Sequence, residues 1–282
     1  MASRKEQKAA NRERLRQEME RRRQRARRNR LLGITAGALV LVVAVVAVGI
    51  AVLNHQEANA RKGGTPKNAV ANGLAIQVGK ASAPVTLTMY EDFRCPACKQ
   101  FELGANGVGG YNATIEKLEN AGKLKVQYHI ASLIDANNPG TNGSKVAGNA
   151  AACASDISAE KFRAFHDVLY RNQPDEQTDG FTTDKVLSLA KQVPGLGSDK
   201  TFTSCVKNDW YRGWLQKVQS QFDTRFNGRV ATPSMLLNGK VMLGGTVEQL
   251  PAEMATPQAF EKTVNSMAAG TDPSSSPSSK GH

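Results

Sequence analysis

The sequence contains few of the residues that bind structural metals, with four cysteines and four histidines among 282 residues. A structural zinc site needs four ligands, commonly two C-x-x-C pairs or one such pair with spaced histidines. Only Cys95 and Cys98 form such a pair, and no histidine stands at ligand spacing. We therefore expect no metal site in this chain.

Charged residues are absent from positions 31–53, a run of 23 residues. A helix of this length would cross the hydrocarbon core of a bilayer, which is about 30 Å thick. The run has no polar face at a helical period, which argues against a helix in a soluble core. It also exceeds the apolar region of a signal peptide, about 7–15 residues, although Ala58-Asn59-Ala60 resembles a cleavage site. We predict an uncleaved transmembrane helix at 31–53.

Basic residues are concentrated before this run. Residues 1–30 hold 13 Lys and Arg against four Asp and Glu, whereas the sequence after residue 53 carries a net charge of only +3. Because positively charged flanks stay in the cytoplasm, we predict a cytoplasmic tail at 1–30 and an extracytoplasmic C-terminal part of a single-pass membrane protein. The tail also has the charge to bind nucleic acid or anionic lipid. We prefer a topology signal, with the lipid bilayer as partner and no nucleic acid.

The rest of the chain divides by composition into a linker, one domain and a tail. Residues 54–72 are rich in Gly, Asn and Lys and are typical of a linker. Residues 270–282 are rich in Pro and Ser and are predicted to be disordered. No internal repeat is present, so one domain at 73–269 remains, with a helical block at about 144–224.

Strands and helices alternate within this domain. Three strands are predicted at 75–78, 85–90 and 124–130, and apolar and polar residues alternate in the last two. An Asn-Gly turn predicts a hairpin of 234–237 with 241–243. Helices are expected from Pro96, at 112–120, through the helical block and at 257–267. The pattern predicts an α/β fold interrupted by a helical insertion.

Cys95 and Cys98 stand where a strand gives way to the helix that begins at Pro96. A cysteine at a helix start faces unpaired N–H groups and the positive end of the helix dipole, which stabilise its thiolate. A second cysteine one turn later is placed to resolve a mixed disulfide. A structural bridge here would close a loop too short to remove much chain entropy. We therefore interpret the pair as a redox site.

The segment DFRCPACK at 92–99, followed by Phe101, resembles the active-site segment of DsbA-like thioredoxin-fold oxidoreductases. Thr232-Pro233-Ser234 is similar to the cis-proline loop of that family, and Pro233 lies 135 residues after Cys98. The resemblance covers about 75–269, including the helical insertion. The basic tail and apolar run in front of it resemble the membrane-bound actinobacterial members.

This resemblance implies a thioredoxin fold with a helical insertion and a redox disulfide in place of any cofactor. It implies that Cys95 is the nucleophile and Cys98 the resolving thiol. It also implies a cis peptide bond at Thr232–Pro233, which places that loop against substrate near Cys95. The residues that flank the cysteines are Asp92, Phe93, Pro96 and Ala97.

Two features of the active-site segment bear on its chemistry. Strong oxidants of this family often carry histidine between the cysteines, whereas Ala97 cannot help to stabilise a thiolate. The oxidising strength is therefore left open. Glu91 and Asp92 would oppose thiolate formation if they lay close to it, but we expect both to be solvated charges at a strand end.

Cys153 and Cys205 both lie in predicted helices of the insertion. They would form either a second redox pair or a structural staple, and no activated-thiol setting surrounds either one, which favours the staple. The resemblance implies such a bridge. It would close a span of 52 residues, a constraint that contributes about 4 kcal/mol in the chain-entropy model.

The sequence thus predicts a membrane-anchored, extracytoplasmic thiol–disulfide oxidoreductase that oxidises cysteines of unfolded exported proteins. By family analogy, a membrane partner similar to DsbB or to vitamin K epoxide reductase would re-oxidise it. Two alternatives stay open at this point. One is a reductase or isomerase that feeds electrons outward, and the other is a non-catalytic chaperone or binding module that uses the thioredoxin groove.

Overall fold

A computed structural model describes residues 64–105, 108–176, 178, 180–244 and 250–271, together with residues 19, 21, 22, 44, 46 and 48. The chain divides into two units, Met1–Glu57 and Ala58–His282. The predicted basic tail and apolar span lie outside the described residues apart from those six positions. Within the described part of the chain, no helix has the length and apolar character needed to cross a membrane. The second unit contains the predicted redox cysteines.

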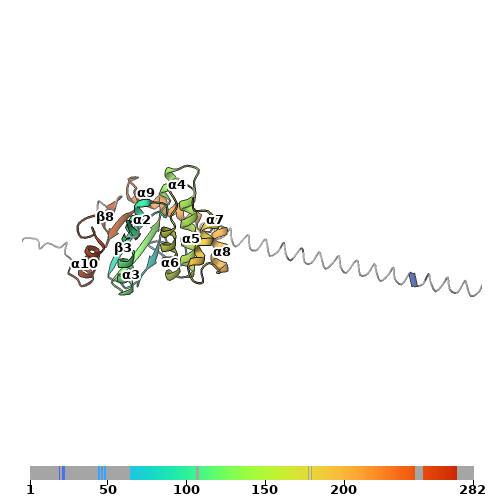
Figure 1. Ribbon diagram of the computed structural model, residues 1–282, viewed down its shortest axis with the longest axis horizontal. Helices are drawn as coiled ribbons and strands as arrows, with labels where there is room; N and C mark the ends of the chain where they lie inside the picture. Colours follow the sequence, from blue (N-terminus) through green and yellow to red (C-terminus); the bar gives the residue numbers. More distant parts are fainter. Residues whose placement is uncertain are drawn as a thin grey trace, which may run out of the picture. The chain divides into compact units, whose positions relative to one another are not determined.

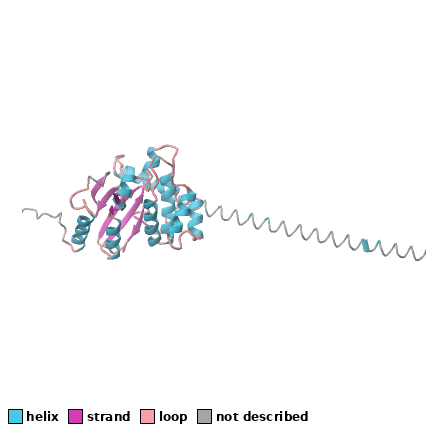
Figure 2. Ribbon diagram, in the orientation of Figure 1, coloured by secondary structure: helices cyan, strands magenta, loops and turns pink. Residues whose placement is uncertain are grey.

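A six-stranded mixed sheet forms the centre of this unit (Figure 2). Its strands occur in the order β1-β2-β6-β3-β7-β8. The central pair, β3 and β6, is parallel, and the other neighbouring pairs are antiparallel. The bounds are Ala69–Val70 for β1, Ala75–Val78 for β2, Val85–Glu91 for β3, Leu124–Ile130 for β6, Ser234–Leu237 for β7 and Lys240–Gly244 for β8.

Strand β3 lies in the middle of the sheet because its apolar residues alternate and fit a buried face. Val85, Leu87 and Met89 are at most 1% exposed, and Leu87 lies opposite Val126 of β6. β3 also pairs with β7 along its other edge, where Tyr90 faces Ser234. This second pairing fixes the loop before β7 next to the end of β3.

Helices flank the sheet and form a block beside it (Figure 1). α10 (Pro257–Ala268) packs against α3 (Asn112–Asn120), and α2 (Pro96–Leu103) packs against both α3 and α6. The block contains α4 (Leu133–Asn137), α5 (Gly143–Ile157), α6 (Ala159–Arg171), α7 (Thr183–Leu189), the 3-10 helix η1 (Ala190–Gln192), α8 (Lys200–Lys207) and α9 (Arg212–Arg225). α6 contacts both α2 and β2, so the block reaches the sheet and the helix that carries the cysteines.

The predicted strands and helices of the domain are confirmed, with small differences at their ends. The helical block begins at Leu133 with α4, earlier than the predicted start at about residue 144. The glycines after α2 form a short hairpin of β4 (Gly104–Ala105) and β5 (Val108–Gly109). Part of the predicted linker belongs to the sheet, because β1 pairs with β2.

Candidate active site

Cys95 and Cys98 lie at the junction of the central strand and α2. β3 ends at Glu91, and Cys95 is the extended N-cap residue of α2, followed by Pro96 in the first helical turn. Proline suits this position because its missing N–H would have no helical partner there. Cys95 is 6% exposed, Cys98 is 1% exposed, and both thiols are free. The position of Cys95 is the one at which the helix start favours a thiolate.

The loop before β7 meets the Cys95 sulfur directly. The peptide bond Thr232–Pro233 is cis, as the resemblance implied. The Cys95 thiol donates a hydrogen bond to the Thr232 carbonyl oxygen, with 3.1 Å between the two atoms. The structure thus brings together two motifs that are far apart in the sequence, and the pairing of β3 with β7 holds them in place.

The pKa values of the two thiols are shifted in opposite directions. A hydrogen bond from Cys98 is the main cause that lowers the pKa of Cys95 to about 7, and it outweighs the opposing effect of burial. Burial is the main cause that raises the pKa of Cys98 well above its usual value, and the Glu91 charge adds to it. Cys95 is therefore the thiol that ionises near neutral pH, and Cys98 stays protonated.

Asp92 is a buried structural residue of the active-site loop. Its carboxylate accepts hydrogen bonds from the backbone N–H groups of Arg94 and Ile134, each at 2.9 Å. Burial raises its pKa to about 6. The prediction that Glu91 and Asp92 are solvated strand-end charges is wrong, since both are 0% exposed. The end of β3 does not reach solvent, because residues around α4 and α6 cover it.

Arg94 fastens the active-site loop to the helical block. Its buried guanidinium forms an ion pair with Asp135 at 2.9 Å and donates to the Thr141 hydroxyl at 2.9 Å. It also donates to the carbonyl oxygens of Glu176 and Thr178. Sequence reasoning missed this role, because an arginine beside the cysteines carries no signal that separates a buried anchor from a solvated side chain.

Gln173 and Phe93 complete the support of the loop from the side of α6. The Gln173 amide donates to the carbonyl oxygens of Phe93 and Cys95, both at 2.9 Å. The Phe93 ring packs against Tyr170 and His166, with centroid separations of 5.2 and 5.5 Å. Ala97 is half-buried, and its methyl group offers neither charge nor hydrogen bond to a thiolate. The helical insertion therefore positions the cysteine pair without supplying a reactive group.

Cys153 and Cys205 form a disulfide between α5 and α8, the pairing that the resemblance implied. Both residues are at most 1% exposed. A buried disulfide within the helical block has no access to substrate, which fits a structural bridge.

One cluster in the described residues has the composition of a metal site. Glu91, Glu102 and His166 each place a ligand atom within 4.8 Å of the others. No sequence pattern indicates this cluster, because the three residues are separated in the chain and show no ligand spacing.

Comparison with known proteins is consistent with this geometry. The family model described as thioredoxin matches residues 71–265. The crystal structure of oxidised DsbA from Mycobacterium tuberculosis is 26% identical and covers 70% of this chain and 99% of its own, with a TM-score of 0.52. Disulfide bond formation protein D of Bacillus subtilis is 25% identical over 165 residues, which are 58% of this chain and 68% of that protein.

A curated relative of another kind shares part of the same domain. The serine/threonine-protein kinase PknE of Mycobacterium tuberculosis is 26% identical over 136 residues, or 47% of this chain. The match spans only 23% of the kinase.

The family model and the DsbA-type relatives confirm the predicted resemblance to DsbA-type oxidoreductases.

Proposed function

Because the chain belongs to the thioredoxin family, we propose that it is a thiol–disulfide oxidoreductase whose Cys95–Cys98 pair exchanges disulfides with substrate cysteines. One observation carries this proposal. The acidic Cys95 thiol stands at the start of α2 and contacts the carbonyl oxygen next to the cis Thr232–Pro233 bond. The helix start stabilises the thiolate. The cis-proline loop presents backbone groups beside the sulfur at which a substrate chain would arrive.

The oxidising cycle follows from the different pKa values of Cys95 and Cys98. A substrate thiolate attacks the Cys95 sulfur of the oxidised pair, the Cys95–Cys98 bond breaks, and Cys98 leaves and takes up a proton. A second substrate thiolate then attacks the substrate sulfur of the mixed disulfide and releases Cys95 as a thiolate. The substrate loses two electrons and the cysteine pair gains them. The lowered pKa of Cys95 makes it the better leaving group in the second step.

We propose the oxidising direction, with proteins that carry free cysteines as substrates. Support comes from the named roles of the relatives, DsbA and a disulfide bond formation protein. A second candidate is a reductase or isomerase, which one observation favours. The pKa of Cys95, about 7, lies near that of thioredoxin and well above the value of about 3.5 in DsbA. The reduction potential of the pair decides between the two directions.

The location and the electron acceptor belong to the same proposal. We propose that residues 31–53 anchor the chain in the cell membrane as a single span, with the N-terminus in the cytoplasm and the catalytic domain outside. The uncharged run and the 13 basic residues before it support this topology. Exported proteins would then be the substrates. A membrane protein similar to DsbB or vitamin K epoxide reductase would accept the electrons.

Trapping of mixed disulfides tests the exchange chemistry. In a Cys98→Ala variant the resolving thiol is absent, so substrates should accumulate as covalent adducts of Cys95 that reductant releases. The matched control is the Cys95→Ser, Cys98→Ala double variant, which should form none. Equal adduct formation by both variants, or none by either, would refute the proposal. Full biological activity of a Cys95→Ser variant would instead support the non-catalytic binding module.

A further inference from the structure

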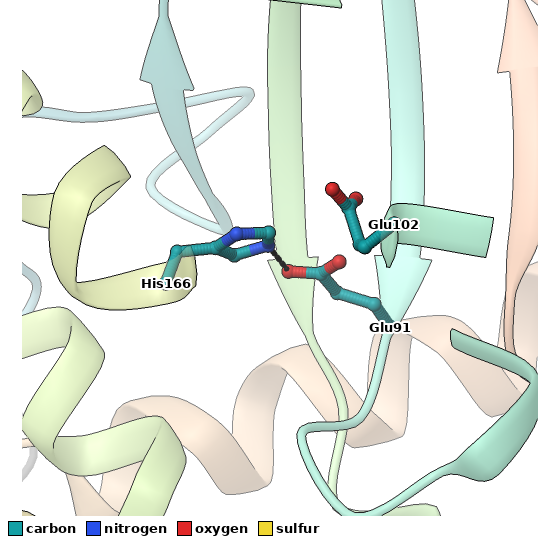
Figure 3. Close-up of side chains that lie close together, drawn as sticks. All are labelled: Glu91, Glu102 and His166. Atoms are coloured by element: carbon teal, nitrogen blue, oxygen red, sulfur yellow. Dashed lines mark hydrogen bonds and ion pairs between the residues drawn. The ribbon is translucent and has the colours of Figure 1, made fainter. Parts of the chain in front are cut away.

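Three buried ionisable side chains from separate elements lie close together at the end of β3 (Figure 3). Glu91 ends β3, Glu102 lies on α2 one turn after Cys98, and His166 comes from α6. Glu91 and His166 are 0% exposed and Glu102 is 1% exposed. We call these residues the Glu–Glu–His cluster. The proposed exchange reaction uses none of them.

Hydrogen bonds within the protein leave this cluster incompletely satisfied. His166 Nε2 lies 2.8 Å from Glu91 Oε1. The other Glu91 oxygen and both Glu102 oxygens have no hydrogen-bond partner among the described residues. Buried carboxylates are normally paired, protonated or bound to a cation, because an isolated buried charge is very costly. Three unpartnered carboxylate oxygens in one buried cluster therefore leave room for a proton or a cation between them.

The neighbouring cation, Arg163, hydrogen-bonds elsewhere and leaves the carboxylate oxygens of the cluster unpartnered. Arg163 is the arginine whose charge acts on Glu102. Its guanidinium donates hydrogen bonds to the Tyr128 hydroxyl and to Asn112 instead. Within the cluster, protonated His166 would balance one carboxylate and leave the second to a proton or to the more distant charge of Arg163. A divalent cation with neutral His166 would balance both carboxylates, so the buried site would carry no net charge.

The orientation of His166 suits a metal ligand. Its Nδ1 lies 3.4 Å from Asp167 Oδ1, which is the arrangement in which a carboxylate holds the proton on one ring nitrogen and leaves the other free to bind a metal. The free nitrogen, Nε2, is the atom that faces Glu91. Imidazole nitrogen combined with carboxylate oxygen favours zinc, manganese or iron over calcium or magnesium, which prefer oxygen alone.

We propose that Glu91, Glu102 and His166 form a binding site for one divalent transition-metal ion of the zinc, manganese and iron class. The ion would replace the proton on His166 Nε2 and occupy the space between the three ligand atoms. Metal–ligand distances of about 2.0–2.2 Å require the His166–Glu91 contact to open slightly when the ion binds. The proposal stands on the cluster alone and does not depend on the proposed function.

The test measures metal binding where the active-site thiols cannot contribute. The full chain carrying Cys95→Ser and Cys98→Ser would be produced in medium supplemented with Zn²⁺, and bound metal would be quantified by mass spectrometry. We expect about one ion per chain and a lower melting temperature after removal by a chelator. With Co²⁺ as the probe, d–d absorption should appear without a sulfur-to-metal charge-transfer band. Ca²⁺ and Mg²⁺ should not displace either ion.

Variants of the same chain locate the ion. Glu102→Gln should lower Co²⁺ affinity at least tenfold, while Glu119→Gln should leave it unchanged. Glu119 is a suitable control, because it is also buried and has one unpartnered oxygen but lies on α3 outside the cluster. Absence of bound metal in the folded Cys95→Ser, Cys98→Ser chain would overturn the proposal and show that protons alone neutralise the cluster. Undiminished binding by folded Glu102→Gln would overturn it equally. If that variant does not fold, His166→Gln provides the same comparison.

Discussion

Cys95 is the residue at which two stabilising influences on a thiolate meet. The start of α2 and the Cys98 thiol both lie at its sulfur. Ala97, between the two cysteines, adds nothing to them. The acidity of Cys95 therefore rests on its immediate neighbours, and single substitutions there are expected to change it without disturbing the fold.

Substitution of Ala97 by histidine should make the pair more oxidising. A positively charged imidazole beside the helix start would stabilise the Cys95 thiolate, lower its pKa by about one unit and raise the reduction potential by about 30 mV. Absorbance at 240 nm against pH and equilibration with glutathione measure the two quantities. Ala97→Gln is the uncharged control, and an equal effect of both substitutions would contradict the electrostatic explanation.

The lowered pKa of Cys95 also makes the stability of the reduced protein depend on pH. The folded value, about 7, lies below the unfolded value of about 8.5. The stabilisation is thus fully present above about pH 8.5 and is lost as the pH falls through 7. We expect the advantage of reduced wild-type protein over Cys95→Ser in free energy of unfolding to shrink by about 1 kcal/mol from pH 8 to pH 6. Urea unfolding at both pH values measures it, and a constant difference would contradict the assigned pKa.

At the scale of elements, the active-site loop is held by the helical block. Arg94 connects the residues between β3 and α2 to Asp135 of α4 and to the segment after α6. Gln173 adds two hydrogen bonds to the same loop. The helical insertion therefore acts as a support for the cysteine pair as well as a cover for the sheet.

Removal of the Arg94 charge should be far more damaging than removal of an exposed arginine. Arg94→Met would leave Asp135 buried without its ion-pair partner and is expected to cost about 3–5 kcal/mol in free energy of unfolding. Arg212→Met is the matched control, because Arg212 pairs with Asp209 at the surface and is 50% exposed, and it should cost less than about 1 kcal/mol. Similar costs in denaturant titration would contradict the anchoring role.

The disulfide of the helical block is expected to affect stability and not chemistry. Replacement of Cys153 and Cys205 by alanine should lower the free energy of unfolding by up to about 4 kcal/mol, because the bridge closes a span of 52 residues. The reduction potential of the Cys95–Cys98 pair should stay the same. A changed potential in the folded double variant would indicate that the two cysteine pairs communicate.

For the whole molecule, the sequence predicted structure best where a hydrophobic pattern or a motif stands at a recognisable place between strands and helices. Strands such as 124–130 were predictable because apolar residues alternate, and the cysteine pair was recognisable because it follows a strand and precedes proline. Buried charges were not predictable. No sequence pattern marks Glu91, Arg94 and His166 as buried. Their burial follows from contacts of the end of β3 with residues of α4 and α6.

The membrane topology is a separate expectation at this scale. If residues 31–53 span the bilayer, a reporter active only outside the cytoplasm should function when fused after residue 271. A reporter active only inside should function when fused before residue 1. Deletion of residues 1–53 should release the domain into the soluble fraction. Retention of the truncated chain in the membrane, or the reverse reporter pattern, would contradict the proposed anchor.

The reduction potential of the Cys95–Cys98 pair tests the central claim most directly. The full chain would be equilibrated in defined redox buffers, and the oxidation state of each cysteine would be read by alkylation and mass spectrometry. We predict a potential between about −120 and −270 mV for Cys95–Cys98, with the upper end marking an oxidase and the lower end a reductase. The Cys153–Cys205 bridge is the internal control and should fall below about −300 mV, as structural disulfides do. A value below −300 mV for Cys95–Cys98, equal to that of the bridge, would show a structural disulfide and contradict the redox function.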